Sequence, residues 1–191
     1  MRFFSINRAN QITLGRVFLV PVFLIMIPVS QKLGSTFRLI PLFVFLVAAA
    51  LDGIDGYVAR KTNQVSFLGT ILDPLADKLL TLSAFFVFVF MQKKPFTGTV
   101  PHWFFLIILI REFILIAGSL LLFVIKHKVF IKPRMAGKLA TILEVLLIGS
   151  ILGGINQYYI NFLLIPVTIL IALSFFLYLI DGVRQLLNLS N

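Results

Sequence analysis

The sequence predicts an all-α, polytopic membrane protein with six transmembrane helices and a short N-terminal interfacial helix. Of the 191 residues 60% are hydrophobic, and the mean hydropathy is +1.05. Soluble domains of this size carry far more polar residues. The apolar residues gather in six runs that are each long enough to cross a bilayer as a helix. No repeat or linker separates these runs, so we expect one domain over residues 1–191.

The first elements are an interfacial segment and a first span. Residues 1–9 mix aromatic and basic side chains, which is typical of a short helix lying on the membrane surface, although a frayed terminus fits equally well. Residues 10–31 form the first span. No small-residue cleavage site follows it, so we expect it to be retained rather than removed as a signal peptide. Arg16 falls in its first turns, where it either snorkels to lipid headgroups or lies near a phosphate ligand.

The second and third spans, residues 37–60 and 67–91, are joined by a short polar run and so predict a helical hairpin. Pro74 removes one backbone donor inside the third span and favours a kink there. The fourth, fifth and sixth spans are expected at residues 100–126, 135–152 and 159–187.

The basic residues predict the orientation. With six spans both termini lie on one side, and that side collects nine Lys and Arg residues in its loops against four on the other. The positive-inside rule therefore places the termini and the hairpin turn in the cytosol.

Four of the seven acidic residues lie in the predicted hairpin. Asp52 and Asp55 are three apart, and Asp73 and Asp77 are four apart, so each pair shares one helix face. Asp55 and Asp73 are about equally distant from the turn, and the same holds for Asp52 and Asp77. Because a helix rises about 1.5 Å per residue, we expect the four carboxylates in one or two layers roughly 14–20 Å from the turn.

Carboxylates in such apolar surroundings need a compensating partner. Oxygen ligands suit a hard cation such as Mg2+, Mn2+ or Ca2+, and the chain has no cysteine for a softer site. Small residues on or near the same faces leave room for a ligand beside the backbone: Gly53, Gly56, Ala59 and Gly69. We therefore expect divalent cations, with a ligand bound to them, between these two helices.

This stretch resembles the signature of the CDP-alcohol phosphotransferase family, which it matches at Asp52-x2-Asp55-Gly56-x2-Ala59-Arg60-x8-Gly69-x3-Asp73-x3-Asp77. The resemblance implies an integral membrane enzyme, expected as a homodimer. It implies two divalent cations, Mg2+ or Mn2+, that hold a CDP-linked lipid and are ligated by Asp52, Asp55, Asp73 and Asp77. Asp77 would also be the catalytic base. The CDP-binding residues would be Gly56, Ala59, Arg60 and Gly69, with Asn10 and Thr13 nearby.

Looser motifs suggest the acceptor. The runs N-Q-I-T-L-G-R, D-P-L-A-D-K-L-L, I-R-E-F and G-K-x-x-T resemble family members that transfer a phosphatidyl group from CDP-diacylglycerol to glycerol 3-phosphate and release CMP. The acceptor phosphate needs cations, which Arg111 and Lys138, with Lys132 or Arg134, would supply. One departure is Ala140, where such members often carry a second Lys.

Two alternatives remain at this point. The run I-K-P at residues 131–133 resembles family members that make cardiolipin, whose acceptor is phosphatidylglycerol. A cation carrier would also place carboxylates inside a membrane, although it does not account for the Gly, Ala and Arg residues between them.

Arg111 and Glu112 fall in the middle of the fourth span. An arginine at this depth is a candidate functional residue. The structural alternative is a pair between Arg111 and Glu112, or between one of them and Glu144. Because neighbours on a helix point in different directions, local pairing does not account for both residues, and we expect Arg111 to face the cavity.

Overall fold

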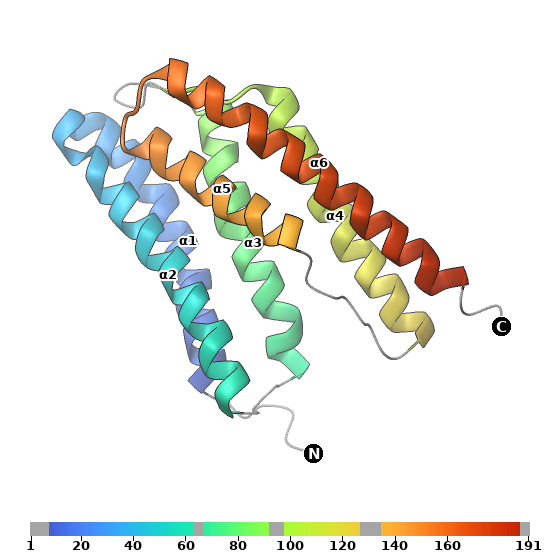
Figure 1. The fold of residues 1–191 in the computed structure, drawn as a ribbon. Coiled ribbons are helices and arrows are strands. Elements are labelled where there is room, and N and C mark those ends of the chain that lie inside the picture. Colours follow the sequence, from blue (N-terminus) through green and yellow to red (C-terminus); the bar gives the residue numbers. More distant parts are fainter. Residues whose placement is uncertain (1–7, 63–66, 92–97, 127–134, 188–191) are drawn as a thin grey trace.

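The chain folds into six α-helices and one short 3-10 helix within the residues that the structure describes (Figure 1). The structure is a computed structural model that describes residues 8–62, 67–91, 98–126 and 135–187. Within these ranges the side chains of residues 8–14, 16–17, 35, 38, 52–62, 67–77, 119–126 and 185–187 lie outside that description. The elements are α1 (Arg8–Leu33), η1 (Ser35–Arg38), α2 (Leu39–Thr62), α3 (Phe67–Phe90), α4 (His102–Lys126), α5 (Met135–Leu152) and α6 (Gln157–Leu187).

The prediction of an all-α protein is confirmed, and each of the six predicted spans begins and ends within two residues of an observed helix. α3 continues through Pro74 without a break in its helical assignment. η1 was not predicted; it follows Gly34 in the connection between α1 and α2. The predicted interfacial helix lies almost wholly outside the described residues.

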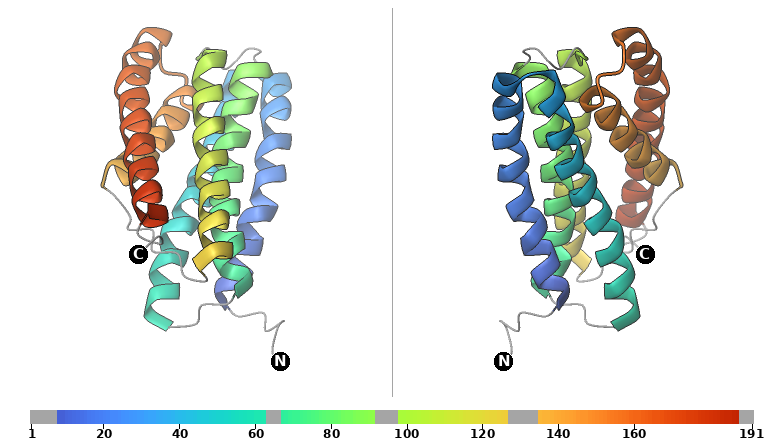
Figure 2. Two further views of the ribbon diagram at one scale, coloured as in Figure 1. Left: turned by 90° about the vertical axis from the view of Figure 1, so that its right-hand side faces the viewer. Right: turned by 90° about the vertical axis from the view of Figure 1, so that its left-hand side faces the viewer.

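Successive helices run in opposite directions, and α1 packs along both α2 and α3 (Figure 2). α1 begins, α2 ends and α3 begins at one end of the bundle, which we call the hairpin end. α4 and α6 also run toward the hairpin end. α5 is shorter, crosses the bundle at an angle and packs mainly on α6, with further contacts to α2 and α3.

Two glycines allow the tight turns at the opposite end. Gly34 has φ 102° and Gly154 has φ 76°, values that favour glycine. At the end of α5 the amide of Gly154 donates to the carbonyl of Ile151 (3.0 Å) and that of Ile155 to the carbonyl of Ser150 (3.0 Å). This pair of hydrogen bonds is a Schellman motif, which stops the helix and satisfies its last carbonyls.

Aromatic and aliphatic side chains fill the space between the helices. The rings of Phe23 on α1 and Phe45 on α2 lie 5.9 Å apart, and those of Phe85 on α3 and Phe104 on α4 lie 5.5 Å apart in an edge-to-face arrangement. All four side chains are fully buried. These contacts join α1 to α2 and α3 to α4 within the core.

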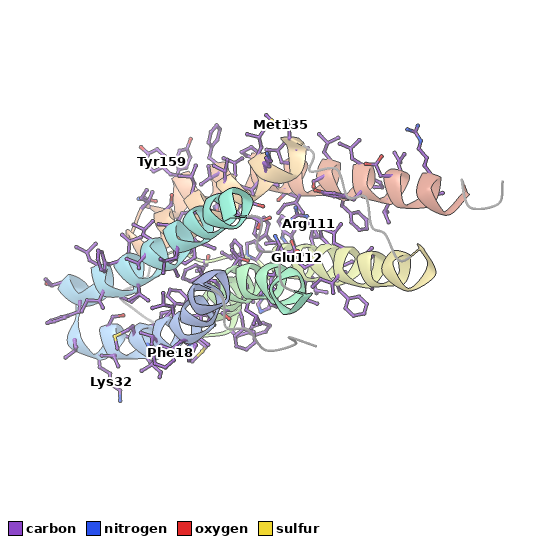
Figure 3. The ribbon with its side chains drawn as sticks, turned by 90° about the horizontal axis from the view of Figure 1, so that it is seen from below. Phe18, Lys32, Arg111, Glu112, Met135 and Tyr159 are labelled. Atoms are coloured by element: carbon purple, nitrogen blue, oxygen red, sulfur yellow. The ribbon has the colours of Figure 1, made fainter. Side chains whose placement is uncertain are left out.

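Large apolar side chains also cover the outside of the bundle. Phe18, Met135 and Tyr159 point away from the core in Figure 3 and are 70%, 72% and 64% exposed. Such side chains occur on every helix, an apolar surface much larger than soluble monomers expose. Two helices are by length and composition able to cross a membrane, Met135–Leu152 and Gln157–Arg184, among the residues that are described.

Candidate active site

The four aspartates of the predicted cation site lie on α2 and α3, at the hairpin end of the bundle. On α2 the buried residues Phe45 and Ala48 mark the inner face. Asp52 and Asp55 follow Ala48 by four and seven residues, the spacing at which that face continues along a helix. The backbone of α2 therefore carries both aspartates at positions in register with its inner face.

The same relationship holds on α3. Thr81, Ala84 and Phe88 are buried and mark the inner face of this helix. Asp77 and Asp73 precede Thr81 by four and eight residues, again in register with that face. Since α2 ends and α3 begins at the hairpin end, both pairs of aspartates lie toward that end of the bundle.

α1 completes this end of the bundle. Its buried residues Val20, Phe23 and Ile27 face α2 and α3. Thr13 precedes Val20 by seven residues, so its position continues the buried face toward the hairpin end. Asn10, three residues before Thr13, falls at the edge of that face. The backbone thus brings one segment of each of three helices to the same end of the molecule.

The side chains of the predicted cation and CDP ligands lie outside the described part of the structure. Their convergence accordingly stays a prediction, as do the CDP-binding roles of Gly56, Ala59, Arg60 and Gly69. Among the described side chains no group of three or more acidic or histidine ligands is found, so within that set no competing cation site appears.

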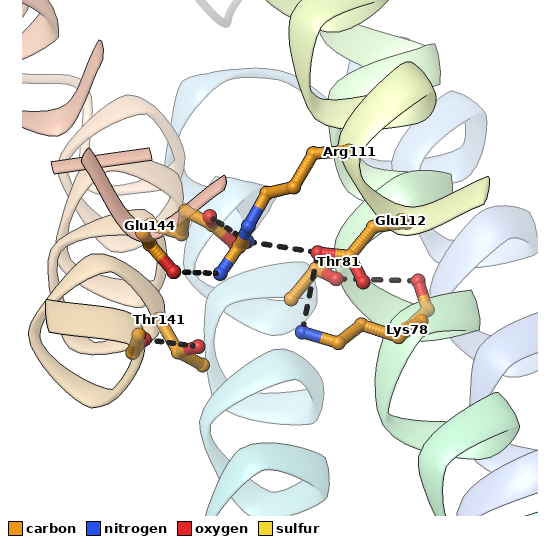
Figure 4. Close-up of polar contacts among 8 residues, drawn as sticks. Lys78, Thr81, Arg111, Glu112, Thr141 and Glu144 are labelled. Atoms are coloured by element: carbon orange, nitrogen blue, oxygen red, sulfur yellow. Dashed lines mark hydrogen bonds and ion pairs between the residues drawn. The ribbon is translucent and has the colours of Figure 1, made fainter. Parts of the chain in front are cut away.

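A buried network of charged side chains lies further along α3, and it joins four helices (Figure 4). Nη1 of Arg111 on α4 donates to Oε1 of Glu112 (2.8 Å) and to Oε1 of Glu144 on α5 (3.0 Å). Nη2 donates to Oγ of Ser174 on α6 (3.4 Å). Nζ of Lys78 on α3 lies 3.4 Å from the same Oε1 atom of Glu112.

The network is almost inaccessible to solvent. The side chains of Arg111 and Glu112 are each 4% exposed and that of Glu144 is 1% exposed, whereas that of Lys78 is 19% exposed. Two cations and two carboxylates balance in charge, which makes their burial tolerable. Nε of Arg111 is buried and has no hydrogen-bond partner among the described residues.

The structure differs here from the expectation that Arg111 would face a cavity. Glu112 points into the same space as Arg111, and the two are directly paired. The physical reason is the length of the arginine side chain, which lets the guanidinium reach a neighbour whose Cβ points elsewhere. The structure therefore shows the alternative that we considered, in which Arg111 is paired with Glu112 and also with Glu144.

The predicted acceptor-binding residues fall in two environments. Lys138 is exposed in the first turn of α5, beside Gly137, whose backbone lies against Ser174 and Tyr178 of α6. Lys132 and Arg134 precede α5 and lie outside the described residues. Ala140, where the resemblance led us to expect a second lysine, is fully buried on the inner face of α5.

Sequence reasoning gave no role to Lys78 or Ser174. Lys78 directly follows Asp77 in the run D-P-L-A-D-K, and an ammonium beside several carboxylates was a signal for pairing. Ser174 is a single small polar residue within the long apolar run of α6, a pattern that indicates a contact between helices.

The fold and these positions define a helical protein with paired acidic residues on two antiparallel helices and a buried ionic network beside them. A sequence model of the CDP-alcohol phosphatidyltransferase family matches residues 6–180, and the chain belongs to that family.

Similar proteins carry one recurring name. The chain is 34% identical to the CDP-diacylglycerol–glycerol-3-phosphate 3-phosphatidyltransferase of Aquifex aeolicus over 182 residues, which cover 95% of each protein. It is 32% identical to the protein of the same name from Bacillus subtilis, with 76% of each protein covered. The counterpart from Rickettsia typhi is 32% identical, with 92% of this chain and 93% of that protein covered.

Proposed function

We propose that this protein transfers a phosphatidyl group from CDP-diacylglycerol to glycerol 3-phosphate and releases CMP, as a step of phospholipid biosynthesis. The observation that carries the proposal is the placement of the family's acidic pattern on α2 and α3, in register with the buried faces of both helices. The shared name of relatives that align over nearly the whole chain supports the same donor and acceptor.

Two divalent cations, Mg2+ or Mn2+, fit this chain because its only clustered donors in the hairpin are carboxylate oxygens. Asp52, Asp55, Asp73 and Asp77 would hold them. When bound, the cations would polarise the phosphoryl oxygens of the CDP donor and stabilise the departing CMP. Gly56, Ala59 and Gly69 lack bulk and would let the CDP group approach the helix backbone.

Asp77 also acts as the general base in this proposal. Its carboxylate takes the proton from the acceptor hydroxyl as that oxygen attacks the phosphorus that carries the lipid. Arg60, Asn10 and Thr13 bind and orient the CDP group at the hairpin end. These assignments follow the family resemblance, and the helix register supports them.

The acceptor phosphate is bound by Lys138, with Lys132 and Arg134 from the segment before α5. Lys138 suits this role because its side chain is exposed in the first turn of α5. The side chain of Arg111 is only 4% exposed, and its Nη1 and Nη2 atoms already bind Glu112, Glu144 and Ser174. We therefore give Arg111 an indirect part in acceptor binding, in which it fixes α5 against α4.

We further propose that all six helices span the cytoplasmic membrane, with the hairpin end in the cytosol, and that the enzyme is a homodimer. Large exposed apolar side chains on every helix and the alternating helix directions support the six spans. This orientation lets the water-soluble CMP leave to the cytosol while the acyl chains stay in the bilayer.

An acceptor panel tests the proposal. Purified protein in detergent is given CDP-diacylglycerol with Mg2+ or Mn2+, and CMP release is measured with glycerol 3-phosphate, with phosphatidylglycerol and without acceptor. We expect release only with glycerol 3-phosphate. Phosphatidylglycerol is included because Ala140 leaves one cation fewer on the inner face of α5 for an acceptor phosphate. Release of CMP with phosphatidylglycerol alone would instead assign the chain to cardiolipin synthesis. Ion flux in liposomes without CMP release would favour a cation carrier.

A further inference from the structure

We infer that Glu112 is a positioning residue for the predicted cation site. Its carboxylate pairs with the ammonium of Lys78, so that this ammonium competes less with the divalent cations for the aspartates. The inference rests on the proposed function. Glu112 is on α4, whereas the predicted ligands are on α2 and α3, and the signature at residues 52–77 that carries the four aspartates does not include it.

The sequence places Lys78 where it can interfere with cation binding. It directly follows Asp77 and comes five residues after Asp73, so its position lies only about 1.5 Å and 7.5 Å from theirs along the helix axis. An ammonium and a divalent cation attract the same oxygens. In surroundings of low dielectric such a competing charge is a large effect.

The structure supplies a second carboxylate for Lys78. Nζ lies 3.4 Å from Oε1 of Glu112, an atom that also accepts from Nη1 of Arg111 at 2.8 Å. Arg111 is in turn bound to Glu144 and Ser174 on two further helices. Glu112 is thereby held at a fixed position beside α3, and its charge acts on Lys78 from the side of α4.

A double-mutant cycle tests this inference through Mn2+ binding, measured by electron paramagnetic resonance on the purified protein with CDP present. Glu112→Gln keeps the shape of the side chain but removes its charge. We expect the apparent Kd for Mn2+ to rise at least about fivefold, the lower end of coupling between linked sites. The double variant Glu112→Gln/Lys78→Met should return this Kd to within about twofold of the wild-type value.

Two single variants complete the experiment. Lys78→Met alone should bind Mn2+ at least as tightly as the wild type, and this variant keeps the test decisive if Glu112→Gln does not fold. Glu144→Gln is the matched control, because it removes a carboxylate from the same network at a position bonded to Arg111. It should lower thermal stability and shift the Mn2+ Kd less than Glu112→Gln does.

Three results would overturn the inference: an unchanged Kd in Glu112→Gln, no recovery in the double variant, or weaker Mn2+ binding in Lys78→Met. Failure of the proposed function looks different, because wild-type protein would then release no CMP. If the wild type releases CMP and Glu112→Gln binds Mn2+ as the wild type does, the function stands and the role of Glu112 is refuted.

Discussion

Nη1 of Arg111 on α4 lies 3.0 Å from Oε1 of Glu144 on α5, and both side chains are buried. The pair joins two helices that are neighbours in the chain but are separated by the segment 127–134. Glu144 follows Lys138, which is exposed in the first turn of α5, by six residues on the same helix. The network thus links the acceptor-binding part of the proposal to the core of the bundle.

Replacing Arg111 should lower the free energy of unfolding of the protein. Arg111→Met removes the cation and leaves Glu112 and Glu144 buried with less compensation, which costs about 3–5 kcal/mol where one partner of a buried pair is removed. The free energy of unfolding can be measured by titration with sodium dodecyl sulfate in mixed micelles. Met is used because it is an apolar side chain of similar length. A loss in the free energy of unfolding well under 1 kcal/mol would show that the network contributes little to stability.

Asp77→Asn should abolish CMP release while CDP binding partly remains, because the amide keeps the shape of the side chain but cannot take a proton from the acceptor. Turnover and CDP affinity are measured on the same preparation. Asp181→Asn, on α6 and outside the proposed site, is the control and should turn over normally. Near-normal turnover of Asp77→Asn would remove this residue from the role of base.

Lys138→Ala should raise the KM for glycerol 3-phosphate and leave the KM for CDP-diacylglycerol unchanged. A hydrogen bond to a charged group is worth about 1.5–3 kcal/mol, so kcat/KM for the acceptor should fall roughly 10- to 100-fold. Lys32→Ala, an exposed lysine at the opposite end of the bundle, should change neither constant. If only the KM for the donor rises, Lys138 belongs to the CDP pocket.

Gly98 and Gly149 should respond in opposite ways to alanine. A Cβ atom at Gly98 would lie 2.5 Å from Cδ1 of Ile160 and 3.1 Å from two atoms of Ile151, and both isoleucines are fully buried. We expect Gly98→Ala to cost about 1–3 kcal/mol in thermal unfolding. Gly149 has open space around its Cα inside α5, so Gly149→Ala should be neutral or should stabilise by up to about 1 kcal/mol. Equal effects at both positions would contradict this packing.

The helices could be predicted from the sequence because long apolar runs and polar breaks set their ends with little help from tertiary contacts. The connection through η1 could not, since it depends on the left-handed backbone of Gly34. The pairing of Arg111 was predicted only as an alternative. The direction of a long flexible side chain is decided by partners on other helices, Glu144 and Ser174 here, and spacing along one helix says nothing of them.

Counting bound Mn2+ tests directly whether the four aspartates of α2 and α3 hold paired divalent cations. Purified protein is equilibrated with Mn2+ and CDP, and the bound metal per chain is determined for the wild type and for the variant in which Asp52, Asp55, Asp73 and Asp77 are all Asn. We expect two Mn2+ ions per wild-type chain and none above background in the variant. Equal amounts of bound Mn2+ in the two proteins would contradict this expectation.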